Sequence, residues 1–138
     1  MSMNRKFFIA ASMLGALSVI FGAFGAHALK ARLEPDQLLV FETGVRYQMC
    51  HAIVLLVLSV LSEKFSSKYI NYAFWCFVIG ILFFSGSIYL LSTRTILGIE
   101  GFTKILGPIT PLGGLLLISG WGLIFISALT SGKMPKDL

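Results

Sequence analysis

The polar residues that could do chemistry are few, and they gather in four short motifs of this 138-residue sequence. The motifs are GAFGAHAL (22–29), FETGVRYQMCH (41–51), FSGSIYLL (84–91) and GPITPLGG (107–114). They include a guanidinium group, which can bind a phosphate or a carboxylate, and two imidazoles, which can carry a proton or ligate a metal. The candidate functional residues therefore lie in these motifs.

We predict that the motifs meet in one polar cluster. Polar groups in an apolar environment are costly, so they normally face the interior of a helical bundle and find partners there. The candidate members are Arg46, His51, Gln48, His27, Glu42, Ser87, Tyr89 and Thr110. The competing interpretation is that these residues only cap and anchor four helix ends, which would also bring polar groups to one level.

The roles of single residues have alternatives. Glu42 and Arg46 are four residues apart, which favours an intrahelical ion pair; the alternative is that Arg46 anchors a phosphate, a carboxylate or a helix end. We expect His51 to be a hydrogen-bonded interior side chain, and His27 an interfacial one, rather than proton carriers or ligands. The serine and threonine hydroxyls are expected to serve helix packing or capping.

No catalytic residue, metal or cofactor is predicted. The sequence contains no G-x-S-x-G, H-E-x-x-H or phosphate-binding loop, and no pair of carboxylates lies inside an apolar stretch. Two histidines without a nearby set of Cys, Asp or Glu make a poor metal site. Cys50 and Cys76 lie in uncharged segments, where a thiol usually behaves as a small apolar side chain.

The elements that must position these residues are long and apolar. The composition is 57% hydrophobic and 12% charged, and four stretches (7–29, 47–62, 69–93 and 105–132) contain no Asp, Glu, Lys or Arg. About 20 apolar residues span a bilayer. The composition therefore excludes a soluble enzyme, a disordered chain and a nucleic-acid binder, and it predicts a multi-pass membrane protein with the lipid bilayer as its first partner.

We predict an all-α, four-helix bundle with up-down-up-down topology in one domain, with spans at about 7–29, 44–62, 69–92 and 111–130. Pro35 suits the first turn of a helix, so the second helix should run from Pro35 to about Leu61. The third should open at Ser66 or Ser67. In the fourth, Thr110 can cap and Pro111 can follow it, which makes residues 101–109 a loop at the interface.

The first span also imitates a secretory signal, because Ala26-His27-Ala28 follows an apolar run. That run, residues 7–25, is longer than the 7–15 residues expected of a signal core, so we expect the segment to be retained.

Small residues recur at helical spacing on two of the predicted spans. On the first span, a stripe of small residues lies on one face, and a similar stripe recurs every seven residues on the last. Small side chains let another helix approach closely. The predicted helix-packing positions are Ala11, Gly15, Ser18, Gly22 and Ala26 on the first span, and Gly113, Gly120 and Ser127 on the last.

The basic residues give a weak orientation signal. With four spans, six basic residues lie on the side of the termini and five on the opposite side. Basic residues favour the cytoplasmic side of a membrane. We therefore expect both termini to be cytoplasmic.

The four motifs also carry a family resemblance. GAFGAHAL, TGVRYQMCHA (43–52), FSGSIYLL and ITPLGGLLLISGW (109–121) resemble the small bacterial membrane proteins of domain-of-unknown-function family 423, which are related to the transmembrane protein 256 group. The resemblance covers about residues 10–127. It implies a four-pass plasma-membrane protein and provides no catalytic residues and no assigned activity.

Three classes of function remain. The first is a non-enzymatic membrane protein that packs with itself or with another membrane protein, which the small-residue stripes favour. The second is a small carrier or channel for an ion, an anion or a lipid head group, which the polar motifs favour. The third, an intramembrane enzyme, has the least support.

Overall fold

The computed structural model describes residues 4–62 and 67–130, and it is helical almost throughout these ranges. The long helices are α1 (Arg5–Phe24), α2 (Pro35–Leu61), α3 (Ser67–Ser92) and α5 (Thr103–Thr130). The short elements are the π-helix η1 (Gly25–Leu29), α4 (Arg94–Leu97) and the 3-10 helix η2 (Glu100–Phe102). Four helical runs in the described ranges are long and apolar enough to cross a membrane.

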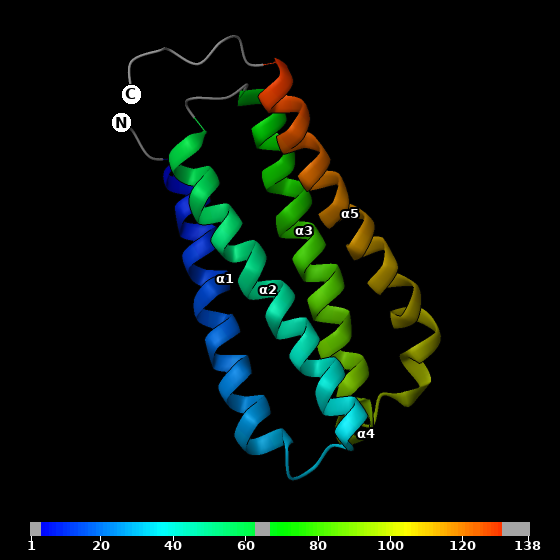
Figure 1. Ribbon diagram of the computed structural model, residues 1–138. Coiled ribbons are helices and arrows are strands. Elements are labelled where there is room, and N and C mark those ends of the chain that lie inside the picture. Colours follow the sequence, from blue (N-terminus) through cyan, green and yellow to red (C-terminus); the bar gives the residue numbers. More distant parts are fainter. Residues whose placement is uncertain (1–3, 63–66, 131–138) are drawn as a thin grey trace.

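The four long helices alternate in direction, which confirms the all-α membrane bundle (Figure 1). Along the array, α1 packs on α2, α2 packs on α3, and α3 packs on α5. No extended packing joins α1 to α5 in the described residues. The helices α1 and α5 are therefore the edges of the array, and α2 and α3 are its centre.

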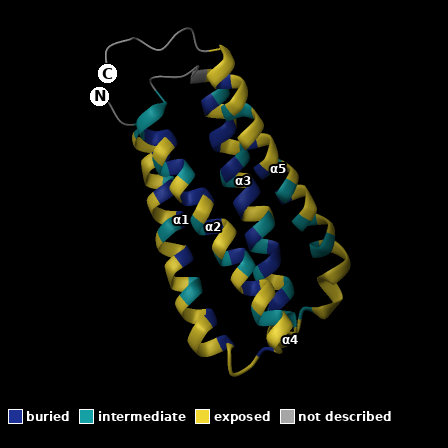
Figure 2. Cartoon of the chain, in the orientation of Figure 1, coloured by how far each residue is buried: buried dark blue, intermediate teal, exposed yellow. Residues whose placement is uncertain are grey.

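Burial follows this order. In the most apolar window, 39% of the residues are buried in α2 and in α3, but only 22% in the α1 and α5 spans. Exposed residues accordingly cover the outer sides of the edge helices (Figure 2). Since a bilayer solvates apolar side chains, the exposed apolar residues can face lipid or another apolar helix.

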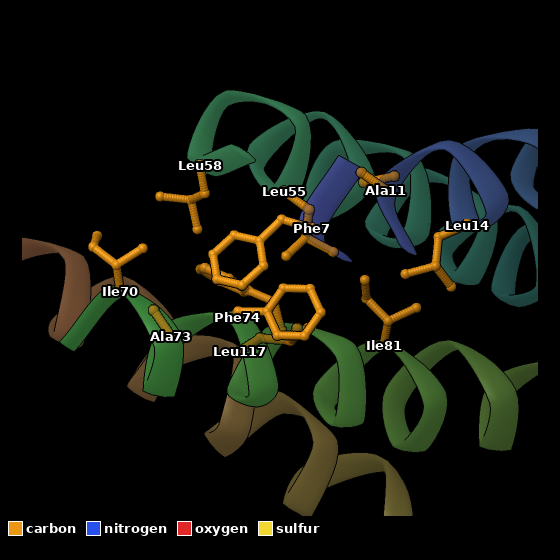
Figure 3. Packing of buried hydrophobic residues seen from close by; sticks show 12 residues of the cluster. Phe7, Ala11, Leu14, Leu55, Leu58, Ile70, Ala73, Phe74, Ile81 and Leu117 are labelled. Atoms are coloured by element: carbon orange, nitrogen blue, oxygen red, sulfur yellow. The ribbon is translucent and has the colours of Figure 1, made fainter. Parts of the chain in front are cut away.

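The main core joins α1, α2 and α3, with one contribution from α5. The rings of Phe7 and Phe74 stack with their centroids 4.2 Å apart, and Leu117 reaches this core from α5 (Figure 3). A second, smaller cluster of Leu29, Leu33 and Phe41 lies near the α1–α2 connection. The two clusters fix the register between α1 and α2 at both ends.

The helix boundaries match the sequence expectation at α2. Pro35 occupies the first turn, and Glu34 and Gln37 form a capping box there. Ser66 and the side chain of Ser67 lie outside the described part, so the expected cap of the third helix is not described.

The expected start of the last helix is wrong. The helix α5 begins at Thr103, and both Pro108 and Pro111 lie inside it. Proline removes one backbone hydrogen bond but is tolerated in membrane helices, where neighbouring groups and local adjustment satisfy the freed carbonyls. Residues 103–109, expected as a loop, therefore form the first turns of α5.

Candidate functional site

Gln48 joins three helices through its side-chain amide. This buried residue of α2 donates from Nε2 to the carbonyl of Leu14 on α1, at 2.8 Å. Its Oε1 accepts a hydrogen bond from the hydroxyl of Tyr89 on α3, also at 2.8 Å. The carbonyl can only accept a hydrogen bond, so the amide nitrogen must face α1. One side chain thus holds α1, α2 and α3 together.

Two buried serines bond to the backbone of α2 beside Gln48. Ser18 on α1 donates to the carbonyl of Val45 at 3.0 Å, and Ser85 on α3 donates to the carbonyl of Gly44 at 2.8 Å. Gly44 is needed here, because a Cβ at this position would lie 2.8 Å from Cε1 of Tyr89. The backbone of α2 around Gly44 therefore accepts hydrogen bonds from α1 on one side and from α3 on the other.

His51 connects α2 to α5. Its Nδ1 lies 2.7 Å from the carbonyl of Tyr47, and Nε1 of Trp121 donates to its Nε2 at 3.3 Å. A carbonyl can only accept and an indole N–H can only donate, so the ring is neutral with its proton on Nδ1. Both nitrogens are used, which places His51 among the hydrogen-bonded interior histidines.

A fourth polar contact joins α3 to α5. The hydroxyls of Ser87 and Thr110 lie 2.7 Å apart, although Thr110 was expected to cap a helix. Because α5 begins at Thr103, about two turns before Thr110, this threonine lies within the helix and faces α3 instead. The structure therefore brings together Gln48 with Tyr89, and Ser87 with Thr110, as separate interhelical contacts.

The other three candidates do not join these contacts. The exposed side chain of His27 lies in η1, close to the end of the first span. The bonds of Leu14 to Gln48 and of Ser18 to Val45 fix the antiparallel register, which separates His27 from His51 by roughly 22 Å along the helices at 1.5 Å per residue. The expectation that His27 and His51 belong to one polar cluster is therefore wrong, because α2 starts sixteen residues before His51.

The expected ion pair of Glu42 with Arg46 is also wrong. Both side chains are exposed, and Arg46 donates from Nη2 to Oγ1 of Thr43 at 3.2 Å. Within residues 4–62 and 67–130, no carboxylate forms an ion pair with Arg46. An i,i+4 pair stabilises a helix by only about 0.2–0.5 kcal/mol, so a bond to a nearer hydroxyl can replace it.

The packing positions predicted for the first span face α2, with the exception of Ala26. Ala11 and Ser18 are buried, and a Cβ on Gly22 would lie 3.4 Å from Val45. Ala26, however, is exposed, and Gly25 is buried against Phe41. The buried positions Ala11, Ser18 and Gly25 recur every seven residues, a spacing of 3.5 residues, whereas a straight helix has 3.6 residues per turn. The contact with α2 therefore falls on Gly25 and not on Ala26.

On the last span, Gly113, Gly120 and Ser127 are all buried. A Cβ on Gly120 would lie 2.7 Å from the ring of Phe77, and a Cβ on Gly113 would meet the backbone of Phe84. These glycines set the close approach of α5 to α3. Gly15 has a looser fit, with Ala52 at 3.9 Å.

Sequence reasoning missed the role of Trp121. Tryptophan normally lies at a membrane interface, where its N–H is wet, but Trp121 is in the middle of an apolar segment. That position was the available signal, because an indole N–H at this depth needs an acceptor. His51 provides it.

The buried polar groups of Gln48, Ser18, Ser85 and His51 form hydrogen bonds between helices. In the part of the chain that the structure describes, every buried side-chain nitrogen or oxygen has a hydrogen-bond partner. The same ranges contain no group of three or more His, Cys, Asp or Glu side chains that could hold a metal. The arrangement can stabilise a fixed packing of four helices.

Shallow grooves lie on the outer surface around Arg46. Two adjoining grooves of about 310 and 290 Å³ share Tyr47 and His51; together we call them the α2–α5 groove. The groove is lined by Thr43, Arg46, Tyr47, Cys50, His51, Phe84, Gly114, Leu117, Ile118 and Trp121. A third groove, of about 240 Å³, lies between α1 and α2 and is lined by Gly22, Gly25, Phe41, Glu42, Val45 and Arg46.

Comparison with known proteins identifies relatives across most of the chain. Residues 21–114 match the profile of the family described as "Protein of unknown function (DUF423)". The chain is 41% identical over 123 residues to a UPF0382 membrane protein of Staphylococcus haemolyticus, covering 89% of this chain and 94% of the relative. It is 40% identical over 125 residues to the UPF0382 membrane protein YwdK of Bacillus subtilis, covering 90% and 96%.

No solved structure matches the chain. The family profile covers more than half of the sequence, and the relatives named as membrane proteins align over nearly all of it. Together with the four apolar helices, these matches make the protein an integral, multi-pass membrane protein. The chain belongs to the DUF423 family of uncharacterised membrane proteins.

Proposed function

We propose that this protein is a non-enzymatic plasma-membrane protein that acts by associating with a second copy of itself or with another membrane protein. The observation that carries the proposal is the open order of the helices, in which the extended packing of α1 is on α2, that of α5 is on α3, and no extended packing joins α1 to α5 in the described residues. Their outer faces expose large apolar side chains, including Val19 on α1 and Phe125 on α5. A further helix could pack against either face.

The interior contacts support the same proposal. Hydrogen bonds between helices occupy the polar side-chain groups of Gln48, Ser18, Ser85 and His51. A bundle with such bonds presents its outer faces in a fixed arrangement, which suits a protein that works by recognition at those faces.

Cross-linking from the two edges tests the association. In a background with Cys50→Ser and Cys76→Ser, single cysteines at Val19 or Phe125 would be treated with a bifunctional thiol reagent in native membranes. We expect a cross-linked dimer or hetero-complex from at least one edge. The matched control is Val57→Cys, which is exposed on the central helix α2. Equal cross-linking from Val57, or none from either edge, would contradict the proposal.

The alternative function is a small carrier or channel for an ion, an anion or a lipid head group. The position of Arg46 in two grooves favours it, since a guanidinium can bind an anion. Reconstituted vesicles loaded with an anion-sensitive dye test this function. We expect flux equal to that of empty vesicles; flux that Arg46→Gln abolishes would favour the carrier instead.

We also propose that both termini are cytoplasmic. The support is the count of basic residues, six on the side of the termini and five on the opposite side. Arg46 strengthens the bias, because it lies within α2 rather than in a connecting loop.

A further inference from the structure

Arg46 places an exposed positive charge on the outer surface of a membrane helix. Its neighbour Val45 accepts a hydrogen bond from Ser18, which lies near the middle of the 25-residue helical run Arg5–Leu29. That run is roughly 37 Å long at 1.5 Å per residue, whereas the hydrocarbon core of a bilayer is about 30 Å thick. Ionisable side chains at membrane depth almost always find a partner.

The described chain gives this guanidinium a hydroxyl but no negative charge. Its bond to Thr43 directs it toward the Pro35 end of α2, which is the direction of the nearer membrane surface. Long basic side chains commonly extend toward the interface in this way, and the bilayer can thin locally to meet them. The anion that a bilayer offers at that surface is a lipid phosphate.

The α2–α5 groove continues from Arg46 into an apolar channel on the surface. Tyr47 and His51 connect the two parts, and the farther part is lined by Phe84, Leu117 and Ile118. Trp121 lies at the level of His51, to which it is hydrogen-bonded. His51 is five residues beyond Arg46 on α2, so the apolar part lies farther than the charge from the Pro35 end of the helix, by roughly 7 Å.

We propose that the α2–α5 groove binds an anionic phospholipid, with its phosphate at Arg46 and one acyl chain along the apolar lining. The charge at the end of the groove nearer Pro35 and the apolar surface beyond it match the two parts of such a lipid. This site does not depend on an association through the edge face of α1, because no residue of α1 lines the groove.

The shape of the groove favours a chain over a second helix. Helices approach closely where small residues line the contact, but the aromatic rings of Tyr47, Phe84 and Trp121 line this groove. A flexible acyl chain can follow a surface between such rings. A second copy of the protein in this groove is therefore the competing outcome of the test.

Binding of defined lipids to the full chain in detergent tests the charge. Native mass spectrometry would compare phosphatidylglycerol with phosphatidylcholine of the same acyl chains. We expect phosphatidylglycerol to bind more tightly, and Arg46→Gln to weaken its binding about tenfold, which is the loss of one charge-assisted bond. The control Arg32→Gln makes the same charge change at an exposed position outside the groove, and it should leave the affinity unchanged.

A second pair of variants tests the acyl-chain part. A Cβ on Gly114 would lie 3.8 Å from the ring of Phe84, an ordinary contact, so Gly114→Leu should fill the groove without displacing α3. We expect it to weaken phosphatidylglycerol binding. Gly122→Leu adds the same side chain to α5 where a Cβ meets nothing within 4 Å, and it should have no effect. Water-soluble glycerophosphate should not displace the lipid.

The rate at which a maleimide labels Cys50 measures lipid binding in the groove independently of how the variant Gly114→Leu folds. Cys50 lines the groove and is exposed, and Cys76→Ser leaves it as the single thiol. Phosphatidylglycerol should slow its labelling by a maleimide severalfold, and Arg46→Gln should remove this protection. Equal affinity for the two lipids, an equal loss from Arg32→Gln, or a Cys50 disulfide between two copies would overturn the proposal.

Discussion

Gln48 joins three helices through one side chain, so its replacement should lower the stability of the bundle. Its amide bonds to both Leu14 on α1 and Tyr89 on α3. Gln48→Leu keeps the size of the side chain but leaves the half-buried hydroxyl of Tyr89 without its acceptor, so we expect a loss of about 1–2 kcal/mol in the free energy of unfolding. Unfolding in detergent followed by circular dichroism measures it.

A double variant separates this contact from general packing. Tyr89→Phe removes the hydroxyl that Gln48→Leu leaves unpaired, so the double variant should lose less than the sum of the single losses. Ser119→Ala is the control, since its exposed hydroxyl bonds only within α5. Additive losses would show that the Gln48–Tyr89 bond contributes nothing of its own.

At this scale the sequence predicted which residue types matter but not how they pair. Gln48, Tyr89, Ser87 and Thr110 could be singled out because polar groups in apolar segments need partners. Their pairing depends on the register between helices, which no single segment contains. The error with His27 has the same origin: the motifs alone placed it in one cluster with His51, whereas the register set by the Ser18–Val45 bond separates the two histidines.

Among the elements, α5 depends on a glycine at its closest contact with α3. A Cβ at Gly113 would meet the backbone nitrogen of Phe84 and lie 2.8 Å from its Cα. Backbone cannot move aside as a flexible side chain can, so Gly113→Ala should destabilise the pair by about 1–3 kcal/mol. Gly114→Ala is the matched control, because its Cβ would only touch the ring of Phe84. Equal melting temperatures for the two variants would contradict this packing.

The pairing of α1 with α2 allows a second comparison. Gly22→Leu extends a side chain toward Val45, which a Cβ alone would already approach to 3.4 Å. We expect a clear loss of thermal stability in detergent, whereas Ile20→Leu, at an exposed position of α1, should be mild. If Ile20→Leu lowers the melting temperature as much as Gly22→Leu does, the α1–α2 contact is not where this packing places it.

The elements themselves were largely predictable, and the exceptions have physical causes. Apolar length and the first-turn proline predicted α2 from Pro35 to Leu61, which is confirmed. Proline rules derived for water misplaced the start of α5, because in a membrane helix Pro108 and Pro111 are tolerated. The π-turn of η1, closed by the bond from Lys30 N–H to the Gly25 carbonyl, has no signature in the composition of GAHAL.

For the whole molecule, the alternation of four helices follows from the sequence, but their open order does not. Short connections predict antiparallel neighbours, and α1–α2 and α2–α3 obey this rule. Whether α1 and α5 also pack on each other depends on which face of α3 each neighbouring helix covers. Because glycines admit α5 closely to α3, it lies along α3 at the far edge from α1.

The alternating directions of the four helices predict on which side of the membrane each connection lies. Helices α1, α2, α3 and α5 cross in alternating directions, so a reporter placed after Leu138 and one inserted at Arg32 should lie on opposite sides of the membrane. With the excess of basic residues on the side of the termini, we expect the fusion after Leu138 to be cytoplasmic. Paired phosphatase and fluorescent-protein fusions measure both positions. Reporters on the same side would contradict the four-span arrangement, whereas opposite sides with termini outside the cytoplasm would reverse only the orientation.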